Sequence, residues 1–170
     1  MPDSEEFDDF VQMQGPKLRR LAYLLCRDVH RAEDLTQSAL VKALRHWGRI
    51  GSMQEPFAYV SRILVRESTS WRSRGSSTEV VSDLSGWEQG IQPDHSDAVV
   101  AADAMWRLLG TLPPKQRAVL VLRYYLDLRD EQIADAMNCS MSTVRSNAAR
   151  AFATLREASG EEQWEVTHDR

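Results

Sequence analysis

Cysteine is scarce in this sequence: Cys26 and Cys139 are the only two among 170 residues, and they stand far apart. Two distant thiols fit neither a disulfide framework nor the spacing of a zinc site, which makes the cytoplasm the expected compartment. No apolar run approaches the roughly 18 residues that a membrane span requires. The acidic start, MPDSEEFDDF, also differs from the basic and then apolar start of a signal peptide. We therefore expect no membrane partner.

Signals for catalysis are equally sparse. The sequence contains no P-loop and no paired-glycine phosphate motif. Cys26 and His30 are four residues apart and could share a helix face, but no Asp or Asn partner is evident and Cys26 belongs to an apolar stripe. The remaining histidines are scattered. We expect a protein that is not an enzyme and that binds no metal or cofactor.

The net charge of −4 hides an uneven distribution along the chain. Residues 17–74 carry twelve basic and five acidic side chains, and residues 111–158 carry seven basic and five acidic ones. Acidic segments precede, separate and follow these two blocks. This asymmetry is typical of nucleic-acid contact on the basic parts, although two solvated domains joined by a polar linker would show it equally. Residues 75–97, rich in Gly, Ser, Pro and Asp, are the expected linker.

From residue 16 to residue 71 the pattern is helical throughout. Apolar residues recur at spacings of three and four from Leu18 to Leu25, and again along residues 31–47, where the stripe includes Leu44. Gly48 and Gly51 predict the end of this second helix. Pro56 suits the first turn of a third helix. Without any strand signal, this block predicts a compact bundle of three or more helices.

The third predicted helix and the residues that follow it are basic. Arginines alternate there with hydroxyl residues and an aromatic ring: Arg62, Arg66, Ser70, Trp71, Arg72 and Arg74. Arginine neutralises phosphate and an aromatic ring stacks on an unpaired base, so the pattern suits melted nucleic acid. Taken alone, however, it fits better with a charged helix face whose Trp71 anchors the core.

The C-terminal block predicts a helix-turn-helix. Pro113 and Pro114 open one helix, and DEQIADAM predicts a second, short one that buries Ile133, Ala134 and Met137. Asn138 lies at the turn, where a positive φ is often needed, and Ser140 is placed to cap the next helix. Val144, Ala148, Ala151 and Leu155 form the buried side of that last helix.

The outward side of the last helix carries short polar groups and arginine, as a recognition helix does in the major groove of DNA. We expect Thr143 and Ser146 to bind phosphate and Arg145 to reach guanine. A plain helical hairpin with a polar face is the less favoured alternative. The residues of this outward face are Ser142, Thr143, Arg145, Ser146, Asn147, Ala149 and Arg150.

Taken in order, these segments resemble a bacterial RNA polymerase sigma factor of the extracytoplasmic-function (ECF) type, in the sigma-70 superfamily. Region 2.2, which binds the clamp helices of the polymerase β′ subunit, resembles RAEDLTQSALVKALRHW. Regions 2.3 and 2.4, which melt and read the −10 element, resemble PFAYVSRILVRESTSWRSR. Region 4, which reads the −35 element, resembles LPPKQRAVLVLRYYLDL followed by DEQIADAMNCSMSTVRSNAARA.

The resemblance implies an all-α protein with two small helical domains joined by a flexible acidic linker. The region 2 domain would span residues 5–74, the linker 75–97 and the region 4 domain 98–158, with an acidic tail at 159–170. The implied partners are core RNA polymerase, through the β′ clamp helices and the β flap, promoter DNA, and in many relatives an anti-sigma factor.

The resemblance also implies which residues act. Core polymerase would be bound by Asp34 and Gln37 of the AEDLxQ motif, together with Leu40, Lys42 and Arg45 on the same helix. The −10 element would be read by the six residues Arg62, Arg66, Ser70, Trp71, Arg72 and Arg74. The −35 element would be read by Ser142, Thr143, Arg145, Ser146, Asn147 and Arg150.

Three positions depart from the family pattern. Arg66 stands where an Asn often helps to hold a base flipped from the −10 element, Ser142 replaces a common Gly, and Asn147 replaces a common Arg. The promoter sequence that this protein reads therefore cannot be inferred from its relatives.

The alternative function is a stand-alone helix-turn-helix regulator that dimerises on palindromic DNA. This alternative explains residues 111–158 but leaves the basic N-terminal block unexplained.

Overall fold

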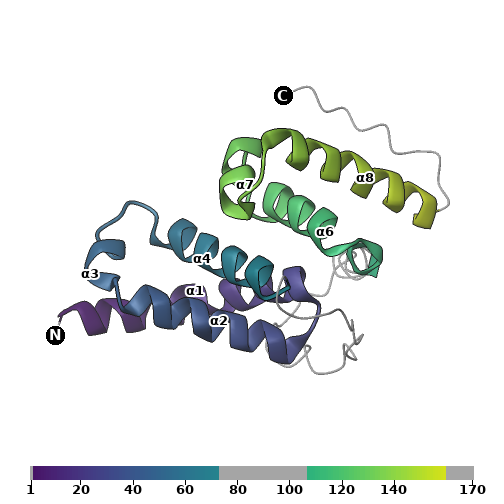
Figure 1. The fold of residues 1–170 in the computed structure, drawn as a ribbon. Coiled ribbons are helices and arrows are strands. Elements are labelled where there is room, and N and C mark those ends of the chain that lie inside the picture. The colour runs from purple at the N-terminus through teal and green to yellow at the C-terminus, as the bar shows by residue number, and fades with distance from the viewer. Residues whose placement is uncertain (1, 73–106, 160–170) are drawn as a thin grey trace, which may run out of the picture.

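The computed structural model describes residues 2–72 and 107–159, which are helical and contain no strand within those two ranges. The helices form two groups (Figure 1). The first contains α1 (Pro2–Cys26), α2 (Val29–Leu44), α3 (Trp47–Ile50) and α4 (Pro56–Arg72). The second contains α6 (Pro114–Leu120), the π-helical segment η2 (Val121–Tyr125), α7 (Asp130–Met137) and α8 (Met141–Ser159). The predicted all-α class is confirmed, and the predicted linker, residues 75–97, lies outside the described residues.

Helix α1 is longer than the apolar periodicity predicted, since it begins at Pro2 and contains Pro16 in its interior. An interior proline removes one backbone hydrogen bond from a helix. The N-terminal half of α1 is held by aromatic packing: the ring centres of Phe7 and Phe10 lie 5.0 and 4.9 Å from that of Trp47. These ring contacts stabilise the part of the helix that precedes the proline, and periodicity alone does not reveal them.

The first group packs around small residues on α2. Ala32, Ala39 and Ala43 are at most 1% exposed, and their short side chains allow α1 and α4 to approach closely. Leu18, Leu21, Leu25, Val60 and Leu64 fill the space around them. The third helix begins at Pro56, as predicted. The second helix ends at Leu44, earlier than predicted, and Gly48 lies inside the short helix α3.

The second group has the predicted helix-turn-helix. Asn138 ends α7 in the left-handed conformation, with a φ of 51°, which asparagine adopts more readily than most residues. The Ser140 hydroxyl accepts a hydrogen bond from the backbone N–H of Thr143, at 3.1 Å, and so caps α8. Buried Ile133 and Ala134 of α7 belong to the same core as Val144 of α8. The π-helical continuation of α6 was not predicted.

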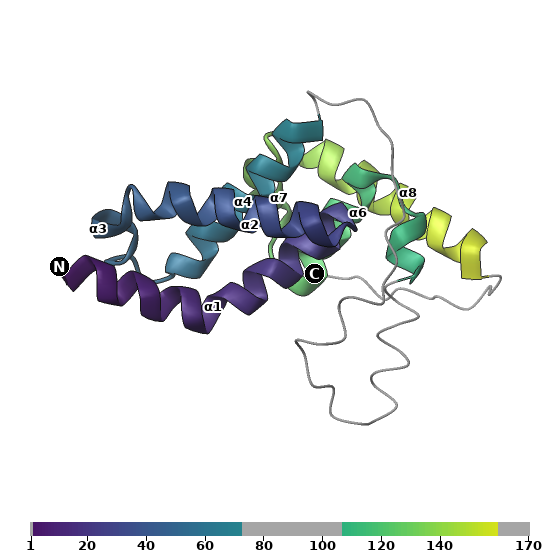
Figure 2. The ribbon, with the colours of Figure 1, turned by 90° about the horizontal axis from the view of Figure 1, so that it is seen from below.

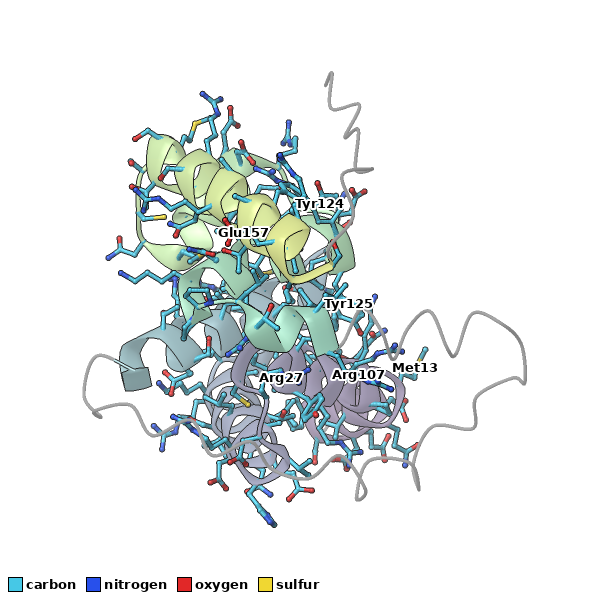
Figure 3. All side chains as sticks on the ribbon, turned by 90° about the vertical axis from the view of Figure 1, so that its right-hand side faces the viewer. Met13, Arg27, Arg107, Tyr124, Tyr125 and Glu157 are labelled. Carbon is cyan, nitrogen blue, oxygen red and sulfur yellow. The ribbon has the colours of Figure 1, made fainter. Side chains whose placement is uncertain are left out.

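The two groups pack directly on each other. Both views place α4 beside α7, and α1 also contacts α6 and η2 (Figures 1 and 2). The centre of the Tyr125 ring lies 5.9 Å from the guanidinium carbon of Arg20, and Figure 3 shows Tyr125 at the junction of the two groups. Within the described ranges, no helix has the length and apolar character needed to cross a membrane.

Candidate nucleic-acid interface

The outward face of α8 is accessible to a ligand. Five of the six residues predicted to read the −35 element are exposed, and Asn147 is half-buried. The exposed five are Ser142, Thr143, Arg145, Ser146 and Arg150. Because the Ser140 cap and the Asn138 turn fix where α8 begins, these side chains cluster in its first three turns. The structure therefore brings this predicted set together on one helix.

Hydrogen bonds within α8 distinguish the members of this face. The Asn147 amide donates to the Thr143 carbonyl at 2.9 Å, and the Ser146 hydroxyl donates to the same oxygen at 3.1 Å. Both side chains are thus held along the helix. Arg145 instead extends to α7, where its Nε lies 3.4 Å from Oδ2 of Asp130. On the outward face of α8, the Arg145 guanidinium is therefore positioned by a contact with α7.

The residues predicted to read the −10 element divide into three kinds. Arg62 lines a cleft of about 620 Å³ between the two helical groups, opposite Tyr125 and Gln132. Arg66 is exposed, and its Nη2 lies 3.7 Å from Oδ1 of Asp135 on α7. The side chains of Ser70, Trp71 and Arg72, and the whole of Arg74, lie outside the part of the chain that the structure describes.

Helix α2 presents the predicted polymerase-binding face. Asp34, Gln37 and Arg45 are exposed, whereas Leu40 is half-buried. Lys42 forms an ion pair with Glu67 of α4, whose second carboxylate oxygen accepts a hydrogen bond from the Ser38 hydroxyl at 3.1 Å. The Lys42 ammonium is therefore engaged in joining α2 to α4.

Two apolar residues of this face were missed. Val41 is 51% exposed and Leu44 is 50% exposed, so the prediction that Leu44 belongs to the buried stripe was wrong. The signal was present in the sequence, because positions 34, 37, 41 and 44 follow the spacing of one helix face. We call Asp34, Gln37, Val41, Leu44 and Arg45 the α2 stripe.

Cys26 and His30, which are four residues apart in the sequence, do not form a catalytic pair. The Cys26 thiol donates a hydrogen bond to the backbone carbonyl of Asp28 at 3.3 Å, and His30 is exposed.

Two other titratable groups are shifted by burial. Burial raises the pKa of the Cys139 thiol, and the charge of Lys115 partly opposes that effect. Burial likewise raises the pKa of Tyr125, with Arg20 acting in the opposite direction.

The crossing pair α7 and α8, with its fixed turn and its polar outward face, defines a helix-turn-helix DNA-binding protein that also carries a separate helical bundle. Family models identify both parts: "Sigma-70 region 2" matches residues 10–78 and "Sigma-70, region 4" matches residues 102–155. The chain belongs to the sigma-70 family of RNA polymerase sigma factors, and it is of the ECF type that the sequence predicted.

Its relatives are sigma factors over most of their length. The chain is 35% identical to the RNA polymerase sigma-E factor of Streptomyces avermitilis, covering 89% of this chain and 84% of that one. It is 25% identical to the ECF RNA polymerase sigma factor SigW of Bacillus subtilis, covering 91% and 89%. A solved structure of similar fold is the sigma factor RpoE of Bartonella quintana in complex with the anti-sigma factor NepR, with a TM-score of 0.62, 22% identity, and coverage of 94% of this chain and 99% of that one.

The function follows from this membership. The protein is a sigma factor, which binds core RNA polymerase and directs it to promoter DNA. The alternative of a stand-alone helix-turn-helix regulator is not favoured, because the region 2 match covers the N-terminal bundle that such a regulator leaves unexplained.

Proposed function

We propose that three surfaces divide the work of promoter recognition. The α2 stripe binds the β′ clamp helices of core polymerase, α4 with the residues that follow it reads the −10 element, and α8 reads the −35 element. The two domains responsible span residues 5–74 and 98–158. We also propose that the protein catalyses no reaction itself, acts in the cytoplasm, and contacts the β flap through its second domain.

The α2 stripe has the composition of a protein-binding surface. Val41 and Leu44 are about half exposed, and Asp34, Gln37 and Arg45 surround them with a carboxylate, an amide and a guanidinium. Interfaces commonly have such an apolar centre and a polar rim. Lys42 acts differently in this proposal: its pairing with Glu67 supports the position of α2 on α4, from where the stripe faces solvent.

The observation that carries the DNA-binding part of the proposal is the capped start of α8. Ser140 and the left-handed Asn138 hold the first turns of the helix, and the exposed Ser142, Thr143 and Arg145 follow at once. A recognition helix contacts base edges with residues of its N-terminal half. Short hydroxyl side chains contact phosphates and arginine contacts guanine in this geometry.

The packing of the two helical groups bears on access to the −10 surface. Arg62 lies in the cleft between the groups and Arg66 pairs with Asp135 of α7, so movement of α7 away from α4 would widen the access of DNA to both arginines. The Arg66 pair is about 60% exposed on each side and holds the groups together only weakly. One similar fold, that of the Bartonella quintana sigma factor RpoE, was solved with an anti-sigma factor bound, which supports an anti-sigma factor as a further partner.

Abortive initiation with bacterial core polymerase tests the proposal. The full chain and a D34A/Q37A variant are compared on a pool of promoter DNA. The matched control is E5A/Q12A, which changes the same kinds of exposed side chain on α1. We expect promoter-specific products that require the protein, that fade with D34A/Q37A and that persist with E5A/Q12A. Full activity of D34A/Q37A, or tight two-fold symmetric binding to duplex DNA without polymerase, would overturn the proposal.

A further inference from the structure

Asp130 links the recognition helix to the helices beneath it. It is the first residue of α7, and its side chain is 23% exposed. Oδ1 of Asp130 binds Nη2 of Arg123 from η2, and Oδ2 lies 3.4 Å from Nε of Arg145 in α8. A single carboxylate thus holds two guanidinium groups that come from two different helical segments.

The two arginines differ in their exposure to solvent. The side chain of Arg123 is 20% exposed and belongs to the packed base of the second helical group, whereas that of Arg145 is 66% exposed and projects from the outward face of α8. The ion pair with Arg123 fixes the position of the Asp130 carboxylate. Arg145 therefore binds a hydrogen-bond acceptor that is already ordered. A surface carboxylate without such an anchor would rotate among several conformations.

The contact engages the guanidinium of Arg145 at Nε. Arginine has five N–H donors in a planar fork, and this contact does not use the donors on Nη1 and Nη2. Guanine presents two acceptors, O6 and N7, in the major groove, and arginine binds them as a bidentate pair. Orienting a long, exposed side chain before it binds reduces the conformational entropy that it loses on binding.

We propose that Asp130 is a positioning residue for promoter reading: it sets the guanidinium of Arg145 for bidentate contact with a guanine of the −35 element. The proposal rests on the proposed role of α8 as the −35 reader. A purely structural role for Asp130, in which it only ties α7 to η2 and α8, would weaken binding to every −35 sequence alike.

The test measures base preference in the assembled enzyme. Core polymerase with the full chain transcribes a promoter library randomised over the −35 element, and the preference at each base position is read from the products. R145A identifies the position that Arg145 reads, where we expect guanine preference to fall by about 5- to 100-fold. D130N should lower the preference at that same position by about 2- to 10-fold and leave the other positions unchanged. E131Q, the same change of charge on the adjacent exposed residue, is the matched control and should change none.

The double variant D130N/R145A should lose no more guanine preference than R145A alone, because Asp130 acts through Arg145. D130E, which keeps the charge but moves the carboxylate, should reproduce the loss and serves if D130N folds poorly. If R145A shifts a base position and neither D130N nor D130E does, or if they weaken all positions equally, Asp130 has no positioning role. If R145A itself changes no base preference, the assignment of α8 as the reader fails and the role of Asp130 falls with it.

Discussion

The guanidinium of Arg117 on α6 donates hydrogen bonds from Nε and Nη2 to the backbone carbonyl of Leu25, at 3.3 and 3.2 Å. Leu25 lies in the last turn of α1, 92 residues away in sequence. Carbonyls at a helix C-terminus lack intrahelical partners and carry partial negative charge. Arg117 is 1% exposed, so it donates to this carbonyl from inside the junction between the two helical groups. Its Nη1 also donates a hydrogen bond to the Leu112 carbonyl, at 3.4 Å.

Replacement of Arg117 by alanine should therefore destabilise the protein. The substitution removes two hydrogen bonds that a charged, buried side chain donates to the Leu25 carbonyl, which costs about 1–3 kcal/mol in the free energy of unfolding. Urea unfolding followed by circular dichroism measures the change. R19A, which removes an exposed arginine of α1, is the control and should shift the midpoint little. Equal midpoints for R117A and R19A would contradict a structural role for the contact.

The α2 stripe predicts a separation between polymerase binding and stability. Leu44 is 50% exposed, so L44S should leave the unfolding midpoint nearly unchanged. At the centre of an interface, loss of such an apolar side chain costs about 1–2 kcal/mol, which corresponds to a 5- to 30-fold weaker affinity for core polymerase. Fluorescence anisotropy of the labelled protein with core polymerase measures it. M13S, at an apolar position of α1 that is 76% exposed, should bind as the unaltered chain does; equal weakening by both variants would argue against the stripe.

The turn of the helix-turn-helix predicts opposite effects of two small substitutions. Asn138 has a φ of 51°, a conformation in which a Cβ without a polar side chain costs about 1–2 kcal/mol. N138A should lower the free energy of unfolding by about that amount, and N138G should be neutral or slightly stabilising because glycine adopts positive φ readily. Thermal unfolding of the two variants checks the order. A more stable N138A than N138G would be inconsistent with the turn.

The Cys139 thiol should react slowly with alkylating reagents. Burial raises its pKa and Lys115 partly lowers it, so its thiolate, which is the reactive form, is less populated at pH 8 than that of an unperturbed thiol. In a C26S background, iodoacetamide should modify Cys139 several-fold more slowly than it modifies glutathione, and K115M should slow it further. Denaturation in urea should restore the ordinary rate. A native rate equal to that of glutathione would show that burial does not control this thiol.

Local signals in the sequence were sufficient for the helix-turn-helix. The Asn138 turn, the Ser140 cap and the short helix α7 over the DEQIADAM segment each depend on residues within a few positions of one another, and all were predicted. The same holds for the start of α4 at Pro56. The longer α1 was not predicted, because its N-terminal half depends on Trp47, a residue far along the chain whose rings contact Phe7 and Phe10.

Local helical spacing also predicted part of each candidate surface. Membership of one helix places Asp34 and Gln37, or Thr143 and Arg145, on a common face whatever the rest of the fold does. Helical spacing does not say which apolar stripe is buried, and so Leu44 was assigned to the core although it faces solvent. Nor does it show that Lys42 pairs with Glu67 of another helix.

From the chain alone, one can therefore derive the helical class, the family, the capped turn and the residue types of each surface, because these depend on short-range geometry and on motif order. The packing of α4 against α7, the capping of α1 by Arg117, and the two guanidinium groups held by Asp130 appear only in the folded molecule. Each joins residues from separate helices, and the energy of such contacts depends on burial and orientation that no local pattern encodes.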